Sequence, residues 1–263
     1  MNAIIVSDLH IGSGYFKFGP FERFLKELPA DHELIMNGDI IDSPYAKMES
    51  SEQRILDLIK EISYLRKVVW IRGNHDNGFT PQSFGSTLFK SSHSIDRRLL
   101  ITHGDDFDDI MPRSRLFIKA FKLMHNIRVK LGAKPVHVAE YAKKWKFFYG
   151  VLRKNVALNA VKCAAENGFE AVTCGHTHYP EDFVLNGVRY INTGAWTEFP
   201  ASYLHITAEE MALNHVTPSS ESYRLERTRS NQTQPAIQFA HANHPPVEYN
   251  AKENPKSQAP NYK

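Results

Sequence analysis

Cysteines and long apolar runs are scarce in this sequence. Among 263 residues only Cys163 and Cys174 are cysteines, and their spacing is not that of a disulfide framework. No stretch approaches the ~18 consecutive apolar residues that a membrane-spanning helix needs. The first residues, MNAIIVSDLH, lack the basic start and the long apolar core of a signal peptide. We therefore expect a cytoplasmic protein with two reduced thiols.

Acidic residues are almost missing from one segment. Between Pro112 and Asn155 twelve residues are Lys or Arg and only Glu140 is acidic, which gives this segment a formal charge of +11. Because the whole chain carries +3, the remainder carries −8. A segment this basic is suited to an anionic partner.

Short apolar runs that end in polar turns predict strands. The runs are AIIVSD, ELIMNGD, KVVWIRGN, RLLITHGD, AVTCGH and VRYINTG. Between the first three of them, helical spacing of apolar residues predicts helices at 18–28 and 50–66. The alternation of strand and helix predicts an α/β fold in which β-sheets are flanked by helices. In such folds functional groups collect at the carboxyl ends of the strands.

Two further segments complete the predicted organisation. Helical spacing is also present at 114–131 and from 135 to about 167, with a break at Gly150. Residues 112–167 are therefore predicted to form a basic helical insert within a domain spanning 1–216. The last 47 residues contain six of the 14 prolines and few large aliphatic residues. Because such a composition buries too little apolar surface to offset the entropy of ordering, we predict a disordered tail at 217–263.

Five polar clusters follow the predicted strands: DLH, GDIID, GNHD, HGD and GHTH. Taken singly, each has an ordinary explanation, such as an Asn-Gly turn, a helix N-cap or a solvated loop histidine. Together they are predicted to meet at one edge of a sheet. Their residues of metal-ligand type are Asp8, His10, Asp39, Asn74, His103, His176 and His178. This mixture of oxygen and nitrogen donors favours Mn²⁺, Fe or Zn²⁺ over Mg²⁺ or Ca²⁺.

The pattern DxH…GDxxD…GNHD…HG…GHxH, spread over residues 1–215, is similar to that of the calcineurin-like metallophosphoesterase superfamily. The resemblance implies a sandwich of β-sheets that holds two divalent metal ions, with Mn²⁺ preferred. The implied ligands of the first ion are Asp8, His10 and His178, and those of the second ion are Asn74, His103 and His176. Asp39 is implied to bridge the two ions, and Asp42 and Asp105 to lie behind the ligands.

The charge balance supports a hydrolytic centre of this kind. Two divalent cations together with Asp8 and Asp39 leave a surplus of about +2, which a phosphate and a hydroxide can neutralise. Cations ~3.5–4 Å apart lower the pKa of a shared water toward ~7. His75 is predicted to stabilise or protonate the leaving group, and Asp76 to orient the His75 ring. The alternative is that His75 only completes a polar turn.

Two features look like the UDP-2,3-diacylglucosamine pyrophosphatase branch of this superfamily. They are the stretch YINTGAWTEF at 190–199 and the helical insert between HGD and GHTH. Members of this branch cleave a lipid-bearing nucleotide sugar during lipid A synthesis, so the resemblance implies such a substrate and peripheral contact with the inner membrane. The closest members have Arg where this sequence has His75, which leaves the exact substrate open.

The basic insert supplies the candidate substrate-binding residues. They are Arg113, Arg115, Lys119, Lys122, Lys143, Lys144, Trp145 and Lys146. Basic residues interleaved with aromatic ones suit an anionic membrane surface or an amphiphilic phosphorylated ligand. They also suit a groove for single-stranded nucleic acid, which makes a nuclease the alternative function. A solvated helical hairpin is the plainest alternative for the insert, and a non-catalytic scaffold, which should have lost ligands, is the alternative for the whole chain.

Overall fold

The protein is described here as a computed structural model that covers residues 1–216, except residues 46, 80, 82, 114 and 134–137. The side chains of residues 112–122, 138 and 139 also lie outside the description. The tail predicted at 217–263 falls outside the described residues. All the described residues belong to one compact unit of the chain.

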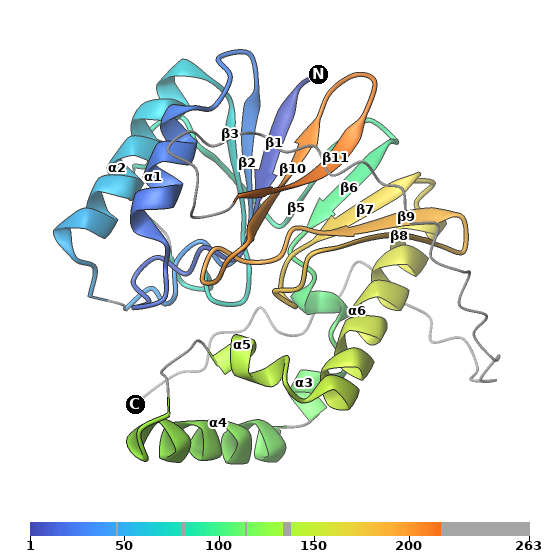
Figure 1. Ribbon diagram of the computed structural model, residues 1–263. Coiled ribbons are helices and arrows are strands. Elements are labelled where there is room, and N and C mark those ends of the chain that lie inside the picture. Colours follow the sequence, from blue (N-terminus) through green and yellow to red (C-terminus); the bar gives the residue numbers. More distant parts are fainter. Residues whose placement is uncertain (46, 80, 82, 114, 134–137, 217–263) are drawn as a thin grey trace, which may run out of the picture. The chain divides into compact units, whose positions relative to one another are not determined.

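Two β-sheets form the centre of the fold (Figure 1). The first sheet has the strand order β11 (Met211–Val216), β10 (Ala201–Ile206), β1 (Ala3–Val6), β2 (Glu33–Asn37), β3 (Val68–Ile71) and β4 (Leu88–Lys90). The second has the order β5 (Ser92–Ile95), β6 (Leu99–Thr102), β7 (Ala171–Cys174), β9 (Val188–Asn192) and β8 (Glu181–Leu185). The first four strands of the chain are parallel, as are β6, β7 and β9. The predicted α/β fold is confirmed, and all six predicted strands are present.

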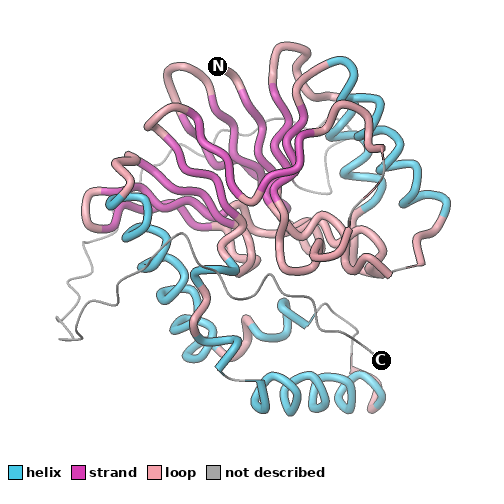
Figure 2. Tube along the Cα trace, turned by 180° about the vertical axis from the view of Figure 1, so that it is seen from behind, coloured by secondary structure: helices cyan, strands magenta, loops and turns pink. Residues whose placement is uncertain are grey.

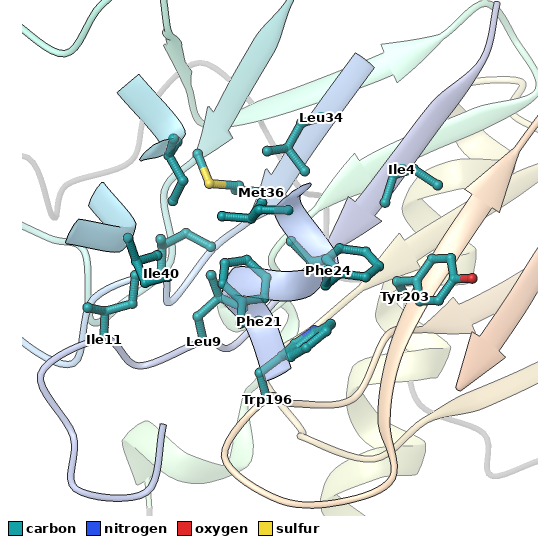
Figure 3. Close-up of a cluster of buried hydrophobic side chains, with 14 of the residues drawn as sticks. Ile4, Leu9, Ile11, Phe21, Phe24, Leu34, Met36, Ile40, Trp196 and Tyr203 are labelled. Atoms are coloured by element: carbon teal, nitrogen blue, oxygen red, sulfur yellow. The ribbon is translucent and has the colours of Figure 1, made fainter. Parts of the chain in front are cut away.

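Helices α1 (Phe18–Lys26) and α2 (Ser50–Leu65) connect the first three strands and cover one face of the first sheet. They occupy the segments predicted at 18–28 and 50–66. Figure 3 shows how Phe21 and Phe24 of α1 meet Trp196 within the apolar core beneath these helices. Helix α2 begins with a capping box, in which the Glu49 N–H donates to Glu52 Oε2 at 2.9 Å.

The central strands β1, β2 and β3 of the first sheet are buried on both faces. In β1, Ile4 and Val6 pack with the helices, whereas Ala3 and Ile5 pack against the second sheet. Because successive side chains of a strand point to opposite faces, burial of both faces requires an unbroken apolar run. This explains why β1, β2 and β3 are mainly continuous apolar runs and do not alternate with polar residues.

Residues 105–166 join β6 to β7 and contain the insert. Their elements are the 3₁₀ turn η1 (Asp105–Phe107) and the helices α3 (Ile110–Arg113), α4 (Arg115–Lys130), α5 (Val138–Ala142) and α6 (Lys146–Glu166). Helix α6 packs on the second sheet through Ala157 and Ala164, on the side away from α1 and α2 (Figure 2). The break predicted at Gly150 is wrong, and the interruption lies between α5 and α6 instead. Burial of Tyr149 and Leu152 on either side of Gly150 outweighs the ~1 kcal/mol cost of a helical glycine.

Both cysteines are free thiols in the structure. Burial raises the pKa of Cys163, which is partly exposed, and raises that of Cys174 further because Cys174 is fully buried in β7. Among the described helices, none combines the length and the apolarity needed to cross a membrane.

Candidate metal centre

The loops that follow β1, β2, β3, β6 and β7 carry the seven predicted ligands, and these loops meet at the carboxyl edge of the sheets (Figure 1). Five of the seven ligands adopt left-handed backbone conformations, with φ between 51° and 60°. They are Asp8, His10, Asp39, His176 and His178. A left-handed conformation costs about 1–2 kcal/mol in a residue with a Cβ. Backbone strain of this kind gathers where a functional site requires a particular side-chain direction.

The first group of ligands converges as predicted from three separate loops. His178 Nε2 lies 3.2 Å from Asp8 Oδ1 and 3.2 Å from His10 Nε2. On the other side of its ring, His10 Nδ1 lies 3.1 Å from Asp42 Oδ1. Because Asp42 accepts the proton on Nδ1, the lone pair of His10 Nε2 faces Asp8 and His178. Asp42 therefore lies behind His10 and not among the converging donors.

Asp39 and His103 form the beginning of a second group. The His103 Nδ1–H donates to the carbonyl oxygen of Asn37 at 3.0 Å, so Nε2 faces Asp39 Oδ2 at 3.2 Å. These two atoms are not aligned for a hydrogen bond, and His103 Nε2 is buried without a hydrogen-bond partner among the described residues. Asp39 Oδ2 also lies 3.9 Å from His10 Nε2, which places this carboxylate between the two groups.

His176 and Asn74 complete the second group. His176 Nδ1 lies 3.2 Å from Asn74 Oδ1, and the His176 ring meets the His103 ring edge to face with centroids 5.5 Å apart. The backbone N–H of His176 donates to Asp8 Oδ1 at 3.1 Å, which ties the loop after β7 to the loop after β1. All seven predicted ligands thus lie in one neighbourhood.

The sequence analysis missed Asp108, which holds the far side of the His176 ring. Asp108 Oδ2 lies 2.9 Å from His176 Nε2. The prediction chose Asp105 from the acidic run at 105–109, but Asp105 lines a polar cavity and acts on His103 only through its charge. A possible signal was the position of Asp108 two residues before a helix, where Asp accepts backbone hydrogen bonds.

Burial and mutual charge shift the pKa values of the buried pairs. Burial opposes ionisation of Asp39, but the neighbouring His103 and His10 hold its pKa well below the usual range. Burial likewise opposes protonation of His103, but Asp39 and Asp8 raise its pKa well above the ordinary value. Burial lowers the pKa of His178 despite the nearby Asp8 carboxylate. The centre is therefore a buried cluster in which negative charge requires a cation, either a proton or a metal ion.

These observations fit a divalent metal better than a set of protons. Donor atoms of Asp8, His10 and His178 lie within 4.8 Å of one another, as do donor atoms of Asp8, Asp39 and His103. His103 Nε2, which faces Asp39 Oδ2 at 3.2 Å without a hydrogen bond, has the arrangement that a ligand of a shared cation adopts. The residues present therefore fit the metal ions that the sequence resemblance implies.

His75 lies beside the first group, but Asp76 does not orient it. The ring of His75 meets the His10 ring edge to face at 4.7 Å, and its Nδ1–H donates to the carbonyl oxygen of Asp42 at 2.7 Å. The buried Asp76 carboxylate instead accepts hydrogen bonds from Ile40 N, Ile41 N, Gly73 N and Trp70 Nε1. The prediction that Asp76 orients His75 is wrong, because these four donors hold the carboxylate in the turn beneath the ring.

The family model of calcineurin-like phosphoesterases matches residues 1–180. The chain belongs to this family. Its members use divalent metals, and the phosphoesterase fold places the candidate ligands of this chain together. No curated protein matches the chain.

Several solved structures are similar to this chain. A single mutant of Vps29 from Entamoeba histolytica is 14% identical with a TM-score of 0.48, covering 86% of this chain and 98% of that chain. YfcE, a phosphoesterase from E. coli, is 15% identical with a TM-score of 0.46, covering 85% and 96%. The nuclease MPE from Pseudomonas putida is 18% identical with a TM-score of 0.38, covering 80% and 85%.

Among the residues of the insert that were predicted to bind substrate, some are exposed and one is paired with an acidic residue. Lys143 forms an ion pair with Glu198 and donates to the carbonyl oxygen of His178 at 2.6 Å, so its charge is already paired. Lys144, Trp145 and Lys146 are exposed. The side chains of four further predicted residues lie outside the described part of the chain: Arg113, Arg115, Lys119 and Lys122.

Two cavities of different chemistry border parts of the phosphoesterase that carry candidate ligands: one borders Asn74, and the other borders the loop after β1, which carries Asp8 and His10. A polar cavity of about 250 Å³ borders Asn74, and its polar lining consists of Arg72, Asn77, Ser91, Thr102, Asp105 and Asp106. A second cavity of about 330 Å³ lies between Tyr15, in the loop after β1, and helix α4. From α4 it is lined by the apolar Leu123, Ile127 and Val129 and by the polar His125, Asn126 and Lys130.

Proposed function

We propose that the chain hydrolyses the pyrophosphate bond of a lipid-bearing nucleotide sugar such as UDP-2,3-diacylglucosamine, with Mn²⁺ as the preferred metal. Membership of the calcineurin-like phosphoesterase family supports hydrolysis of a phosphoester or pyrophosphate bond. The observation that supports the choice of substrate is a pair of unlike cavities, one bordering Asn74 and the other bordering the loop that carries Asp8 and His10.

Two divalent ions would be held by the converging side chains. The residues that would hold the first ion are Asp8, His10 and His178, and those for the second are Asn74, His103 and His176. The Asp39 carboxylate lies between the two groups and would contact both ions. When bound, such a pair of ions supplies a water of lowered pKa and positive charge for the phosphate oxygens.

His75 would stabilise or protonate the leaving-group oxygen. Because the Asp42 carbonyl accepts the proton on Nδ1, Nε2 is the nitrogen that can exchange a proton with the substrate. The His75 N–H donates to Asp39 Oδ1 at 2.8 Å, which fixes the backbone of this residue to the central carboxylate. His75 therefore has a fixed position relative to the metal ligands, as a general acid requires.

The two cavities suit the two ends of the proposed substrate. The polar cavity beside Asn74 has carboxylates that can accept hydrogen bonds from ribose hydroxyls, and amide, hydroxyl and guanidinium groups for a base. The cavity along α4 has apolar walls for an acyl chain and Lys130 for a phosphate or sugar. A pyrophosphate lying between them would reach the candidate ligands.

The insert would bring the enzyme to an anionic membrane surface, where such a substrate resides. Phe147 and Leu131 are 88% and 82% exposed, and the exposed Lys144 and Lys146 lie close to Phe147 in sequence. Exposed apolar side chains next to basic ones favour contact with the boundary between lipid headgroups and acyl chains.

Hydrolysis of three substrates tests the proposal. Purified enzyme loaded with Mn²⁺ should release UMP from UDP-2,3-diacylglucosamine, and act much more slowly on single-stranded oligonucleotides. Release of nucleotides from the oligonucleotides without UMP from the lipid would favour the nuclease alternative. If bis-p-nitrophenyl phosphate is also left intact with Mn²⁺ present, the chain is a scaffold and not an enzyme.

Removal of apolar surface from α4 tests the acyl cavity. Replacing Leu123→Ser and Ile127→Ser together should raise the KM for the acylated substrate about 10–100-fold, because an acyl chain would bury only part of each side chain and each lost contact would then cost about 0.7–1.4 kcal/mol, roughly half the value of full burial. The KM for an unacylated analogue should not change. Leu158→Ser, which alters an exposed leucine of α6, is the control. An equal rise in KM for both substrates would contradict an acyl site on α4.

A further inference from the structure

Asp108 connects a candidate metal ligand to the start of the insert. One carboxylate oxygen, Oδ2, lies 2.9 Å from His176 Nε2. The other, Oδ1, accepts hydrogen bonds from the backbone N–H groups of Ile110 and Met111, each at 2.9 Å, at the start of α3. The side chain is buried, with 5% exposure, and both oxygens are engaged by these protein groups. A movement of α3 would therefore move the group that holds His176.

Helix α6 fixes the residues on both sides of Asp108. Asn155 Oδ1 accepts a hydrogen bond from the Asp109 N–H at 3.0 Å, and Asn159 Nδ2 donates to the carbonyl oxygen of Phe107 at 2.9 Å. The position of Asp108 is thus determined by two helices of the insert, and not by the loop after β6 alone.

The insert also holds the rest of the loop that contains His176 and His178. The Tyr149 hydroxyl of α6 donates to the carbonyl oxygen of Thr177, and Lys143 Nζ donates to that of His178 at 2.6 Å. Three side chains of the 105–166 segment therefore contact three successive residues of this loop. The contact at Asp108 is the one that reaches an imidazole ring.

We propose that Asp108 is a positioning residue through which the insert sets the affinity of the chain for the second metal ion. The Asp108 carboxylate accepts the proton on His176 Nε2, which leaves the Nδ1 lone pair directed toward Asn74 Oδ1. Carboxylates behind ligating histidines fix the tautomer and raise the basicity of the ligand. This inference rests on the proposed metal centre and does not depend on the identity of the substrate.

Substitution of serine at position 108 separates the two tasks of the carboxylate. A serine hydroxyl can still accept from backbone N–H groups two and three residues further along the chain. It is too short to reach His176 Nε2. The matched control is Asp109→Ser, which changes the adjacent carboxylate, whose Oδ2 accepts a hydrogen bond from Asn159 but does not contact His176.

Calorimetric titration with Mn²⁺ gives the decisive measurement. The native chain and Asp109→Ser should bind two ions with similar affinities. Asp108→Ser should bind the first ion normally and the second about 10–100-fold more weakly. The electron paramagnetic resonance signal of a coupled Mn²⁺ pair should then disappear from Asp108→Ser at a Mn²⁺ concentration that retains it in the native chain.

Other results would overturn the inference. Native affinity for both ions in Asp108→Ser would show that the carboxylate does not act on the metal, and equal weakening of both ions would show general damage to the fold. Weakening of the second ion by Asp109→Ser would assign the effect to the segment and not to Asp108. If the native chain binds two ions but releases no UMP, the proposed substrate is wrong, whereas the inference about Asp108 is unaffected.

Discussion

Three of the candidate histidine ligands, His10, His103 and His176, have one ring nitrogen bonded to a protein oxygen and the other directed into the centre. The oxygens belong to Asp42 for His10, to the Asn37 carbonyl for His103 and to Asp108 for His176. Because the tautomers are set before any ion arrives, the centre needs little rearrangement on metal binding. We therefore expect single substitutions in the centre to change metal binding or turnover.

His75→Ala should lower kcat without removing metal. The ring contacts the Asp42 carbonyl and the His10 ring edge, and its loss should cost the roughly 10²–10⁴-fold that a general acid contributes. Turnover and metal content of the variant, the latter by elemental analysis, should be compared with those of His93→Ala, which alters a histidine of β5. Equal loss of turnover and bound metal would show that His75 supports the ligands instead.

Gly73→Ala should weaken the centre through a steric clash. A Cβ at this position would overlap the Asp39 carboxylate and backbone nitrogen, and would crowd the His103 ring. The expected loss is about 1–3 kcal/mol of unfolding free energy, as for other overpacked buried sites, together with reduced Mn²⁺ affinity. Denaturant unfolding and metal titration measure the two effects, and native values in both would contradict the close approach.

Helix α6 is the element on which the insert depends, because it packs on the second sheet and also contacts the loop of His176 and His178. Its buried residues keep helical spacing along its whole length, but Gly150 lowers the helix propensity of its first half. The helix forms through this glycine because its neighbours are buried, which a local reading of the sequence does not reveal.

Gly150→Ala should stabilise the protein. A Cβ at this position meets nothing within 4 Å outside the helix itself, and alanine is about 1 kcal/mol better than glycine within a helix. Thermal or denaturant unfolding should show a gain of about 0.5–1 kcal/mol, opposite in sign to the effect of Gly73→Ala. A loss of stability would mean that the helix is broken at this position in solution.

In the whole protein, the two sheets bring loops that are as much as 170 residues apart in sequence to one edge, as with Asp8 and His178. The left-handed ligand residues and the facing lone pairs both oppose folding when no cation is present. Folding and metal binding are therefore expected to be linked.

Removal of metal should lower the melting temperature. Each ion present at a hundredfold excess over its Kd adds about 2.7 kcal/mol to the native state. For a chain of this size that gain corresponds to roughly 5–10 °C per ion. Calorimetric scans in EDTA and in Mn²⁺ measure the difference, with Mg²⁺ as a comparison because its preference for oxygen ligands predicts a smaller shift. Identical melting temperatures in EDTA and Mn²⁺ would contradict the metal centre.

The sequence was sufficient to predict the order of strands and helices as far as β3. It also predicted the strands β1, β2, β3, β6, β7 and β9, and the seven candidate ligands that lie together in the structure. These features are encoded locally, because a strand buried on both faces must be apolar and the polar cluster follows directly at its end. The strands β4, β5, β8, β10 and β11 were not predicted, since their short or mixed sequences are selected by pairing with neighbours.

The partners of the site residues follow from packing between distant segments. The pairing of His176 with Asp108 depends on where α3 and α6 place residue 108, and that of Lys143 with Glu198 depends on the segment before α6. The contact of His75 with the Asp42 carbonyl depends on how the loops after β2 and β3 pack together. Neighbouring acids in a run have the same chemistry, so their order in the chain cannot distinguish them. Their distances and directions to the ligands, which only the folded chain establishes, assign each one its role.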